Sequence, residues 1–428
     1  MGPSSDLGRI FRSARNALDM TQGEVGRAVG YSASAISRIE RNRMRVDFET
    51  RLRLAHVLHI PPERVSGFPV PAAPVIATVG NVPMPDEEDA MRRRTVLGAL
   101  AAGASTVAVG TGTAAAGQTA SSLSLDDMLF HLPGAEPAPL RVLASGTAGA
   151  REAFTAARYN DLANALPALL SAAEATRDAS VGRARQQASA VLARGYVLAA
   201  ELAAKEHSDT AWVAADRALA AARASGMPIP IGEATRVLAI TMRRSGRASS
   251  AVRLLTHEAD QLDPAEARTG AVRTSLLLTA AYSAAAGGDR TTALALLDEA
   301  DETVERHPQA PDGLFTVDAT RTQVAVYRIG VHTTLGTPDD GVPIVQNLNI
   351  RLMPNAERRA RAWTDTARMW HALGNGQQAF AALRRVEQEA AQEVSRPALR
   401  ALTSNLLYGP SRVEGLREFA VRTGAVPA

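Results

Sequence analysis

The sequence predicts an all-α protein with a compact N-terminal five-helix bundle, a linker and a C-terminal α-solenoid. Three observations predict this class. Apolar residues recur at helical spacing on both sides of residues 67–137. Aromatic residues make up only 4% of the chain and alanine is frequent, which favours close-packed helices over sheets. Helix pairs recur about every 40 residues in the C-terminal two-thirds. We therefore expect domains at residues 5–66 and 138–425, joined by the linker at 67–137.

The N-terminal bundle begins with a helix whose apolar residues recur at i, i+3, i+4 and i+7. These residues are Leu7, Ile10, Phe11, Ala14 and Leu18. The fourth helix has its apolar positions at Phe48, Leu52, Leu54, Ala55, Val57 and Leu58. Pro61 and Pro62 open a short fifth element, because proline is favoured at the first position of a helix.

Between these helices, residues 21–43 predict two short helices joined by a tight turn. Thr21 and Glu24 form the pattern of a capping box at the start of the first short helix. Its apolar face is made of Val25, Ala28 and Val29. Gly30 ends this helix, since glycine tolerates the left-handed conformation that a sharp turn needs. Ser32 is suited to cap the next helix.

The second of these short helices has an apolar side and a side of small polar residues. Ala35, Ile36 and Ile39 are expected to point inward. The outward positions are Ala33, Ser34, Ser37 and Arg38. Apart from the arginine these side chains are short, so the helix can lie close to the base edges of a DNA major groove. Arg41, Arg43 and Arg45 follow at the helix end, within reach of phosphates.

Residues 5–66 resemble the Cro/phage-repressor (xenobiotic-response-element) type of helix-turn-helix domain. The resemblance is carried by Met20–Gln22, Val29–Ser32 and Ile36–Asn42. It implies that Gln22 contacts a phosphate. It also implies that one set of side chains faces bases or nearby phosphates, namely Ser32, Ala33, Ser34, Ser37 and Arg38. Arg15 and Glu40 occupy the positions of a buried ion pair in that family.

The chain departs from the family pattern at three positions. Ala33 and Ser34 are small where some relatives carry glutamine, so bidentate readout of adenine is not expected there. Arg38 remains able to read guanine. Asn42 stands where the family often has glycine, and asparagine also tolerates the left-handed conformation.

Positive charge gathers on this N-terminal part. Residues 1–65 hold eleven arginines and seven acidic residues, a net charge of +4, whereas the whole chain has +3, which leaves −1 for the rest. The alternative is an arginine-rich bundle that binds no DNA. The positive excess on residues 1–65 speaks weakly against it, because phosphate binding requires positive charge on the domain that reads DNA.

The linker contains an unusual segment. Prolines and an acidic run at residues 86–89 predict an extended chain. Arg92–Arg94 then precede an uncharged stretch rich in alanine and glycine, which covers residues 95–125 and resembles a twin-arginine export signal. Three interpretations stay open: a linker, which we favour, a membrane span and a displaced export signal. We expect a cytoplasmic protein, with membrane association as the less favoured alternative.

In the C-terminal two-thirds, a helix, a break, and then alanine followed by a large apolar residue recur. The pattern falls at Ala165-Leu166, Ala211-Trp212, Ala251-Val252, Ala293-Leu294 and Ala379-Phe380. A small residue lets paired helices approach each other. The pattern resembles a degenerate tetratricopeptide-repeat array, expected at residues 138–425. The resemblance implies dimerisation and binding of a peptide or protein ligand; a role in assembly alone is the alternative.

No catalytic or cofactor site is expected. The chain has no cysteine, which excludes disulfides, cysteine-ligated zinc and thiol catalysis. His56 and His59 lack further metal ligands nearby, and Gly110–Gly112 lacks the third glycine of a dinucleotide-binding loop. Lys205 is the only lysine, which together with abundant alanine indicates a GC-rich bacterial genome of actinobacterial type.

Together these features predict a sequence-specific DNA-binding transcriptional regulator that acts as a homodimer and is not an enzyme. No cofactor or metal is expected, and double-stranded DNA is the expected partner. The alternative function is a repeat scaffold or peptide receptor with a vestigial N-terminal domain, with or without a membrane tether.

Overall fold

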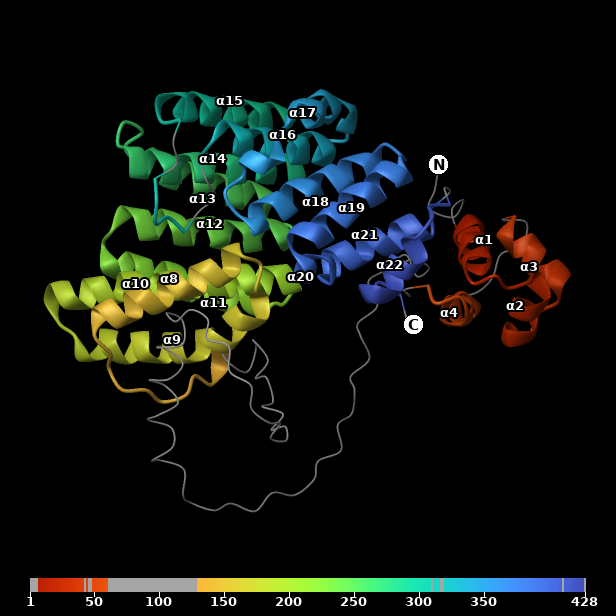
Figure 1. Ribbon diagram of the computed structural model, residues 1–428, viewed down its shortest axis with the longest axis horizontal. Helices are drawn as coiled ribbons and strands as arrows, with labels where there is room; N and C mark the ends of the chain where they lie inside the picture. Colours follow the sequence, from red (N-terminus) through yellow and green to blue (C-terminus); the bar gives the residue numbers. More distant parts are fainter. Residues whose placement is uncertain are drawn as a thin grey trace, which may run out of the picture. The chain divides into compact units, whose positions relative to one another are not determined.

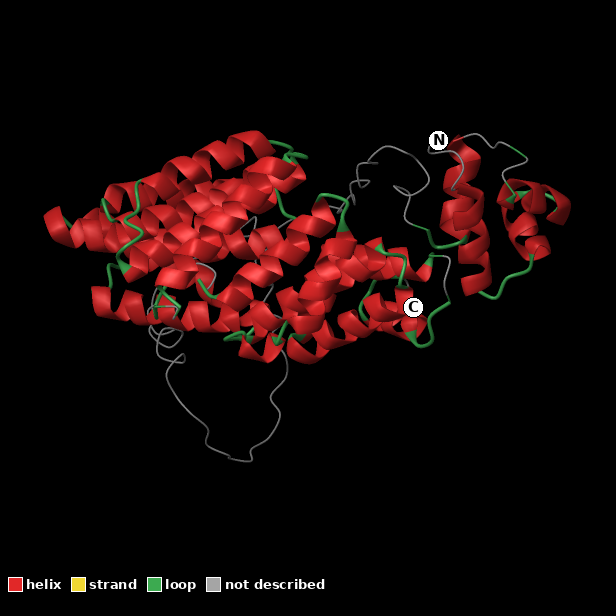
Figure 2. Cartoon of the chain, turned by 90° about the horizontal axis from the view of Figure 1, so that it is seen from above, coloured by secondary structure: helices red, strands yellow, loops and turns green. Residues whose placement is uncertain are grey.

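The computed structural model describes residues 7–41, 44, 48–60, 129–308, 311–315, 319–409 and 412–426. Across these residues all regular elements are helices and there is no strand (Figure 2). The predicted all-α class is therefore confirmed. The chain divides into two compact units. The head unit comprises Met1–Asp86, Gly374–Ala381 and Ala398–Ala428, and the repeat unit comprises Glu87–Leu373 and Ala382–Pro397.

Among its described residues, the head unit contains four short N-terminal helices and elements from the C-terminal part of the chain (Figure 1). The N-terminal helices are α1 (Leu7–Ala17), α2 (Gln22–Val29), α3 (Ala33–Glu40) and α4 (Phe48–Val57). The later elements are the first turns of α19 (Gly376–Glu389), then α21 (Pro397–Leu407) and α22 (Leu416–Arg422). The fifth element predicted at Pro61 and Pro62 lies outside the described residues, as does the segment at 95–125.

The core of the N-terminal helices is formed mainly by the predicted apolar faces. Its buried members include Phe11, Ala14, Val25, Val29, Ile36, Ile39, Leu54, Ala55 and Leu58. One prediction was wrong: Ala28 is exposed, and Gly26 is buried in its place. The inward face of α2 is rotated because its glycine approaches the turn that follows.

A residue from the end of the chain completes this core. Tyr408 is buried among the residues of the N-terminal helices, and its hydroxyl donates a hydrogen bond of 2.7 Å to the His59 carbonyl oxygen. Leu407 and Val426 pack against the same cluster. His59 lies beyond the end of α4 with φ 51°. The head unit therefore needs both ends of the sequence.

The repeat unit is a series of antiparallel helix pairs (Figure 1). Its helices are α8 (Leu140–Thr155), α9 (Tyr159–Ala179), α10 (Gly182–Glu206), α11 (Thr210–Ser225), α12 (Pro228–Arg244), α13 (Ala248–Asp260), α14 (Ala267–Ala286), α15 (Arg290–Arg306), α16 (Arg321–Thr334), α17 (Val342–Asn347), α18 (Ala356–Ala372) and α20 (Ala391–Val394), with short 3₁₀ turns η3 (Pro338–Gly341) and η4 (Ile350–Leu352). The even-numbered helices from α10 to α18 pack on one another in order, and α8 packs against both α10 and α18. The inner helices thus close on themselves.

The predicted repeat pattern holds at most of its positions. Ala211, Ala251, Ala293 and Ala379 are buried as expected. Ala165 is exposed, so the prediction was wrong at this position. Of the pair Ala165 and Leu166, only the leucine faces the core. α9 already begins at Tyr159, and its buried face is formed by Leu162, Leu166 and Leu169. Repeat-like packing of adjacent helices is confirmed, while the tetratricopeptide assignment stays a prediction.

A buried network of charges joins the first inner helices of the repeat unit to the last. The Lys205 ammonium donates hydrogen bonds of 2.7 Å to both Glu357 and Glu393. The Tyr159 hydroxyl also donates to Glu393. Glu201 accepts hydrogen bonds from Arg151 on α8 and Arg236 on α12. Because these side chains come from opposite ends of the helix series, the network holds the closed arrangement together.

A segment between α15 and α16 reaches the same interior. The backbone N–H of Phe315 donates a hydrogen bond of 2.7 Å to Glu233, a carboxylate that also accepts two hydrogen bonds from Arg194. The Phe315 ring lies 4.7 Å from the Arg194 guanidinium and 5.2 Å from that of Arg151. The connecting segment therefore fills part of the interior with an aromatic side chain between two cations.

Among the described helices, none has the length and apolar character required to cross a bilayer. The segment at residues 95–125, for which a membrane span was one interpretation, is not among the residues described.

Candidate nucleic-acid interface

The turn between α2 and α3 has the geometry that the sequence predicts. Thr21 caps α2, and the reciprocal hydrogen bonds with Glu24 complete a capping box. The backbone N–H and the hydroxyl of Thr21 hold the pKa of the Glu24 carboxyl below its usual range, so this cap stays charged at neutral pH. Gly30 ends α2 with φ 77°, and the Ser32 hydroxyl caps α3 by accepting from the Ala35 N–H.

Gly26 is a second glycine that this turn requires. A side chain there would collide with the backbone carbonyl of Tyr31, and the Tyr31 N–H donates a hydrogen bond of 2.8 Å back to the Gly26 carbonyl oxygen. The close approach fixes the angle at which the chain enters α3. Sequence reasoning missed this position; the available signal was a glycine inside a helix, which costs stability unless close packing requires it.

A buried carboxylate fixes α3 to α1 and α2. The Glu40 side chain is 1% exposed and accepts hydrogen bonds from the Arg15 Nε at 2.6 Å and Nη2 at 3.2 Å. Arg15 also donates to the carbonyl oxygen of Met20. The ion pair that the family resemblance implied is therefore confirmed, and it sets the orientation of α3.

Gln22 belongs to the same group of contacts. Its side-chain amide nitrogen donates a hydrogen bond of 2.8 Å to Glu40. The family resemblance implies that Gln22 contacts a DNA phosphate. In the structure its side chain instead joins the start of α2 to the end of α3. The role of Gln22 at a phosphate stays a prediction.

The remaining predicted contact residues form one side of α3. Ser32, Ala33, Ser34 and Arg38 are exposed, and Ser37 is half-buried. The hydroxyls of Ser32 and Ser34 lie 3.0 Å apart. Arg41 is exposed at the C-terminal cap of α3. Arg43 and Arg45 lie outside the described residues. The described part of the set thus shares one accessible face and one helix end.

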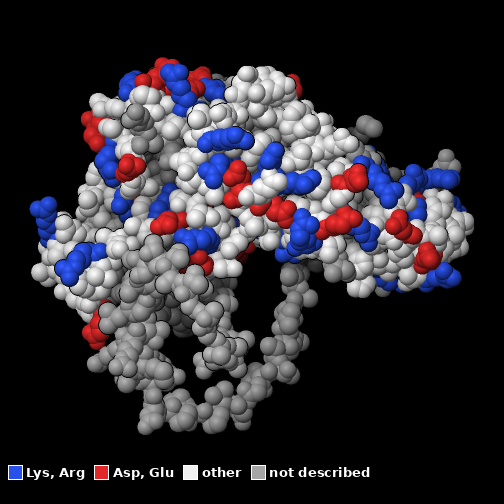
Figure 3. All heavy atoms as spheres, in the orientation of Figure 1, with Lys and Arg blue, Asp and Glu red and all other residues white. Residues whose placement is uncertain are grey.

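Arginine side chains are accessible across the surface of the N-terminal helices. Those on α1 to α4 that are exposed include Arg9, Arg12, Arg27, Arg38, Arg41 and Arg53. Over these helices Figure 3 shows cationic side chains at the surface, interspersed with carboxylates. Exposed guanidinium groups are the donors that bind phosphates and the major-groove edge of guanine.

A comparison with known families bears on this region. Residues 6–66 match the family model for a helix-turn-helix domain. The match supports a DNA-binding regulator and covers the N-terminal part of the chain alone. Comparisons with curated proteins and with solved structures gave no significant match. Within the described residues, no group of histidine and acidic side chains could hold a metal ion.

Proposed function

We propose that the protein is a sequence-specific transcriptional regulator that places α3 in the major groove of double-stranded DNA. The observation that carries the proposal is the accessible face of α3, which is fixed to α1 by the buried Arg15–Glu40 pair. A helix presented in this way, after a turn at Gly30, is how helix-turn-helix domains read DNA.

Short side chains on α3 determine how bases are read. Ala33 and Ser34 are exposed at the first turn of the helix, where they let its backbone approach the bases. Arg38 is the long cationic side chain on that face, and it matches the acceptors of guanine. Arg41 at the end of the helix contacts phosphates, and the sequence predicts the same role for Arg43 and Arg45, which follow it.

One copy of α3 offers a single long side chain for base readout, so we propose that two copies act together on paired half-sites. The repeat unit supplies dimerisation or the binding of a peptide or protein ligand. This assignment draws support from the repeat-like packing of adjacent helices. The protein acts by binding rather than catalysis, in the cytoplasm where the bacterial chromosome lies.

Selection of binding sites from a random pool of DNA duplexes tests the proposal. The purified full chain is expected to enrich one sequence with two related half-sites. A matched variant, Arg38→Glu with Ser34→Asp, reverses the charge of the exposed face without touching a buried residue, and it should enrich nothing. Failure of the unmodified chain to enrich any sequence would overturn the proposal and favour a scaffold in which the N-terminal domain is vestigial.

A further inference from the structure

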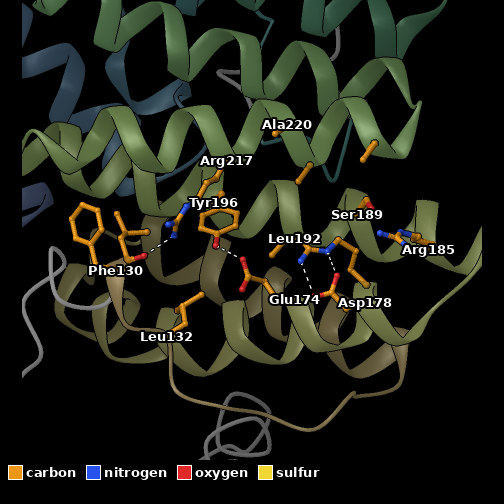
Figure 4. A pocket seen from close by; sticks show the side chains of 14 residues that line it. Phe130, Leu132, Glu174, Asp178, Arg185, Ser189, Leu192, Tyr196, Arg217 and Ala220 are labelled. Atoms are coloured by element: carbon orange, nitrogen blue, oxygen red, sulfur yellow. Dashed lines mark hydrogen bonds and ion pairs between the residues drawn. The ribbon is translucent and has the colours of Figure 1, made fainter.

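The repeat unit contains a cavity between α9, α10 and α11, closed at one side by residues 129–132 (Figure 4). Its volume is about 610 Å³, which falls within the range of small-molecule sites, about 300–1,000 Å³. The cavity lies away from the charged interior of the inner helices and has no part in the proposed contact with DNA. Its lining is therefore unexplained by the function proposed above.

Four side chains of α10 line the cavity in a row. Arg185, Ser189, Leu192 and Tyr196 lie three or four residues apart, so they share one face of the helix. In Figure 4 the arginine and serine lie toward one end of the cavity, and the tyrosine lies toward the other with Phe130. The cavity thus has a cationic end and an aromatic end.

The polar groups at the aromatic end already have partners. The Tyr196 hydroxyl donates a hydrogen bond of 2.6 Å to Glu174. The Arg217 guanidinium donates to the Leu129 carbonyl oxygen at 2.6 Å and lies 5.8 Å from the Tyr196 ring. Tyr196 itself is 1% exposed, so the surface that this end offers a ligand comes from Leu132 and the 59%-exposed Phe130.

Two side chains at the cationic end have polar groups that form no hydrogen bond with other described residues. The Ser189 hydroxyl is buried and forms no hydrogen bond. The buried hydroxyls of Ser171 and Ser283 in the repeat unit instead donate to the carbonyl four residues earlier, whereas that of Ser275 also lacks a partner. A buried polar group without a partner costs about 1–3 kcal/mol, which a ligand that supplies an acceptor removes.

The second group is the guanidinium of Arg185, which is exposed and forms no hydrogen bond within the described part of the chain, although its charge helps to lower the pKa of Asp178. The neighbouring carboxylate, Asp178, is already held by Arg177 through hydrogen bonds of 2.7 and 3.0 Å. Three arginines and two carboxylates line the cavity, a net charge of +1. A single negative charge on the ligand balances this lining.

We propose that the cavity binds a small aromatic organic acid. Its acid group accepts hydrogen bonds from Arg185 and Ser189, and its apolar body extends toward Leu132 and Phe130. This site does not depend on the proposed contact with DNA, so it can be tested on the full chain without any duplex.

Two fluorescent probes that differ only in the acid group test the assignment. The probe 1-anilinonaphthalene-8-sulfonate carries the negative charge, and N-phenyl-1-naphthylamine is the same molecule without it. The unmodified chain should bind the sulfonate saturably, with one high-affinity site. Arg185→Ala should weaken sulfonate binding about tenfold, as expected for loss of a hydrogen bond between charged groups, and should leave binding of the neutral probe unchanged.

Matched variants separate this site from other surfaces. Arg183→Ala removes a neighbouring exposed arginine that does not line the cavity, and sulfonate affinity should stay unchanged. Ala220→Trp fills the cavity from an exposed position of α11, and both probes should lose the site while the thermal unfolding transition is retained. Equal losses in Arg183→Ala and Arg185→Ala, or undiminished binding to Ala220→Trp, would overturn the proposal.

Discussion

The arginines of α3 and those inside the repeat unit have the same chemistry and opposite surroundings. Arg38 and Arg41 are exposed at the surface of the head unit. Arg236 and Arg151 lie in the repeat interior and bind the carboxylate of Glu201. The difference shows that charge counts do not locate a DNA-binding surface. Internal carboxylates pair the interior guanidinium groups, whereas those on α3 remain accessible to an external anion.

The buried network also carries a cost that the exposed arginines do not. Removing two opposite charges from water is costly, and good geometry only offsets that cost. Removing one partner leaves a buried charge without compensation, which costs much more than losing a surface ion pair. Substitutions in the two regions should therefore affect different properties: stability in the repeat unit and affinity for DNA in the head unit.

Lys205→Met should have the largest effect, because it leaves Glu357 and Glu393 without their shared cation. We expect the free energy of unfolding of the repeat unit to fall by about 3–5 kcal/mol. All three tryptophans, Trp212, Trp363 and Trp370, lie in the repeat unit, so tryptophan fluorescence during urea denaturation measures its unfolding. Arg183→Met on the same helix is the surface control, and an equal effect of both substitutions would contradict the account.

Tyr408→Ala should destabilise the head unit by about 3 kcal/mol, because it removes an aromatic side chain from the core of the N-terminal helices. Tyr408→Phe loses only the hydrogen bond to the His59 carbonyl, a change of about 1 kcal/mol. The urea concentration at which DNA binding is lost should fall, while the tryptophan transition stays in place. A shift of the tryptophan transition alone would show that Tyr408 does not belong to the head core.

Acid should lower the stability of the repeat unit, and the direction of this effect follows from the pKa of Glu357. Burial by itself would raise the pKa of Glu357, but Arg358 and Lys205 outweigh burial and hold it below the ordinary value of 4.5. A lowered folded-state pKa stabilises the fold above pH 4.5, and this contribution is lost as the pH falls further. Each such carboxylate contributes at most about 1.4 kcal/mol per pH unit.

Tryptophan-monitored denaturation between pH 7 and pH 3 measures that dependence. The contribution of Glu357 to the free energy of unfolding should change little between pH 7 and pH 5, and it should fall at lower pH. The difference in stability between Lys205→Met and the unmodified chain should narrow below pH 4.5, because Glu357 and Glu393 take up protons more readily without the lysine. A difference that widens with acid would contradict the assignment of the ion pairs.

Arg41→Ala should have the smallest effect. An arginine that contacts phosphate adds affinity on every sequence, so its loss weakens binding evenly and lowers the salt slope by about one. Binding to a selected and a scrambled duplex over a series of salt concentrations measures both quantities. Arg223→Ala, an exposed arginine of α11, is the control and should change neither.

Local signals predicted the local structure well. The capping box at Thr21, the left-handed Gly30 and the capping role of Ser32 depend on residues a few positions apart, and all three are present. The Arg15–Glu40 pair spans 25 positions and came from the family resemblance rather than from spacing. Periodicity misplaced Ala28 and Ala165, because an apolar residue at helical spacing does not by itself determine which way the helix is rotated.

Contacts between distant residues were not predictable from the chain alone. Tyr408 reaches His59 across 349 positions, and Lys205 reaches Glu357 across 152. No pattern within a helix specifies which helix from the other end of the sequence will pack against it. For the same reason the free Ser189 hydroxyl and the adjacent cavity become visible only once α9, α10 and α11 are placed together.

The central claim is that α3 reads bases through Arg38. The most direct test is the ratio of affinities for the selected duplex and for the same duplex with its guanines exchanged, measured with the unmodified chain and with Arg38→Ala at one salt concentration. The account predicts that Arg38→Ala loses about 1–3 kcal/mol of discrimination. An unchanged ratio would contradict the claim.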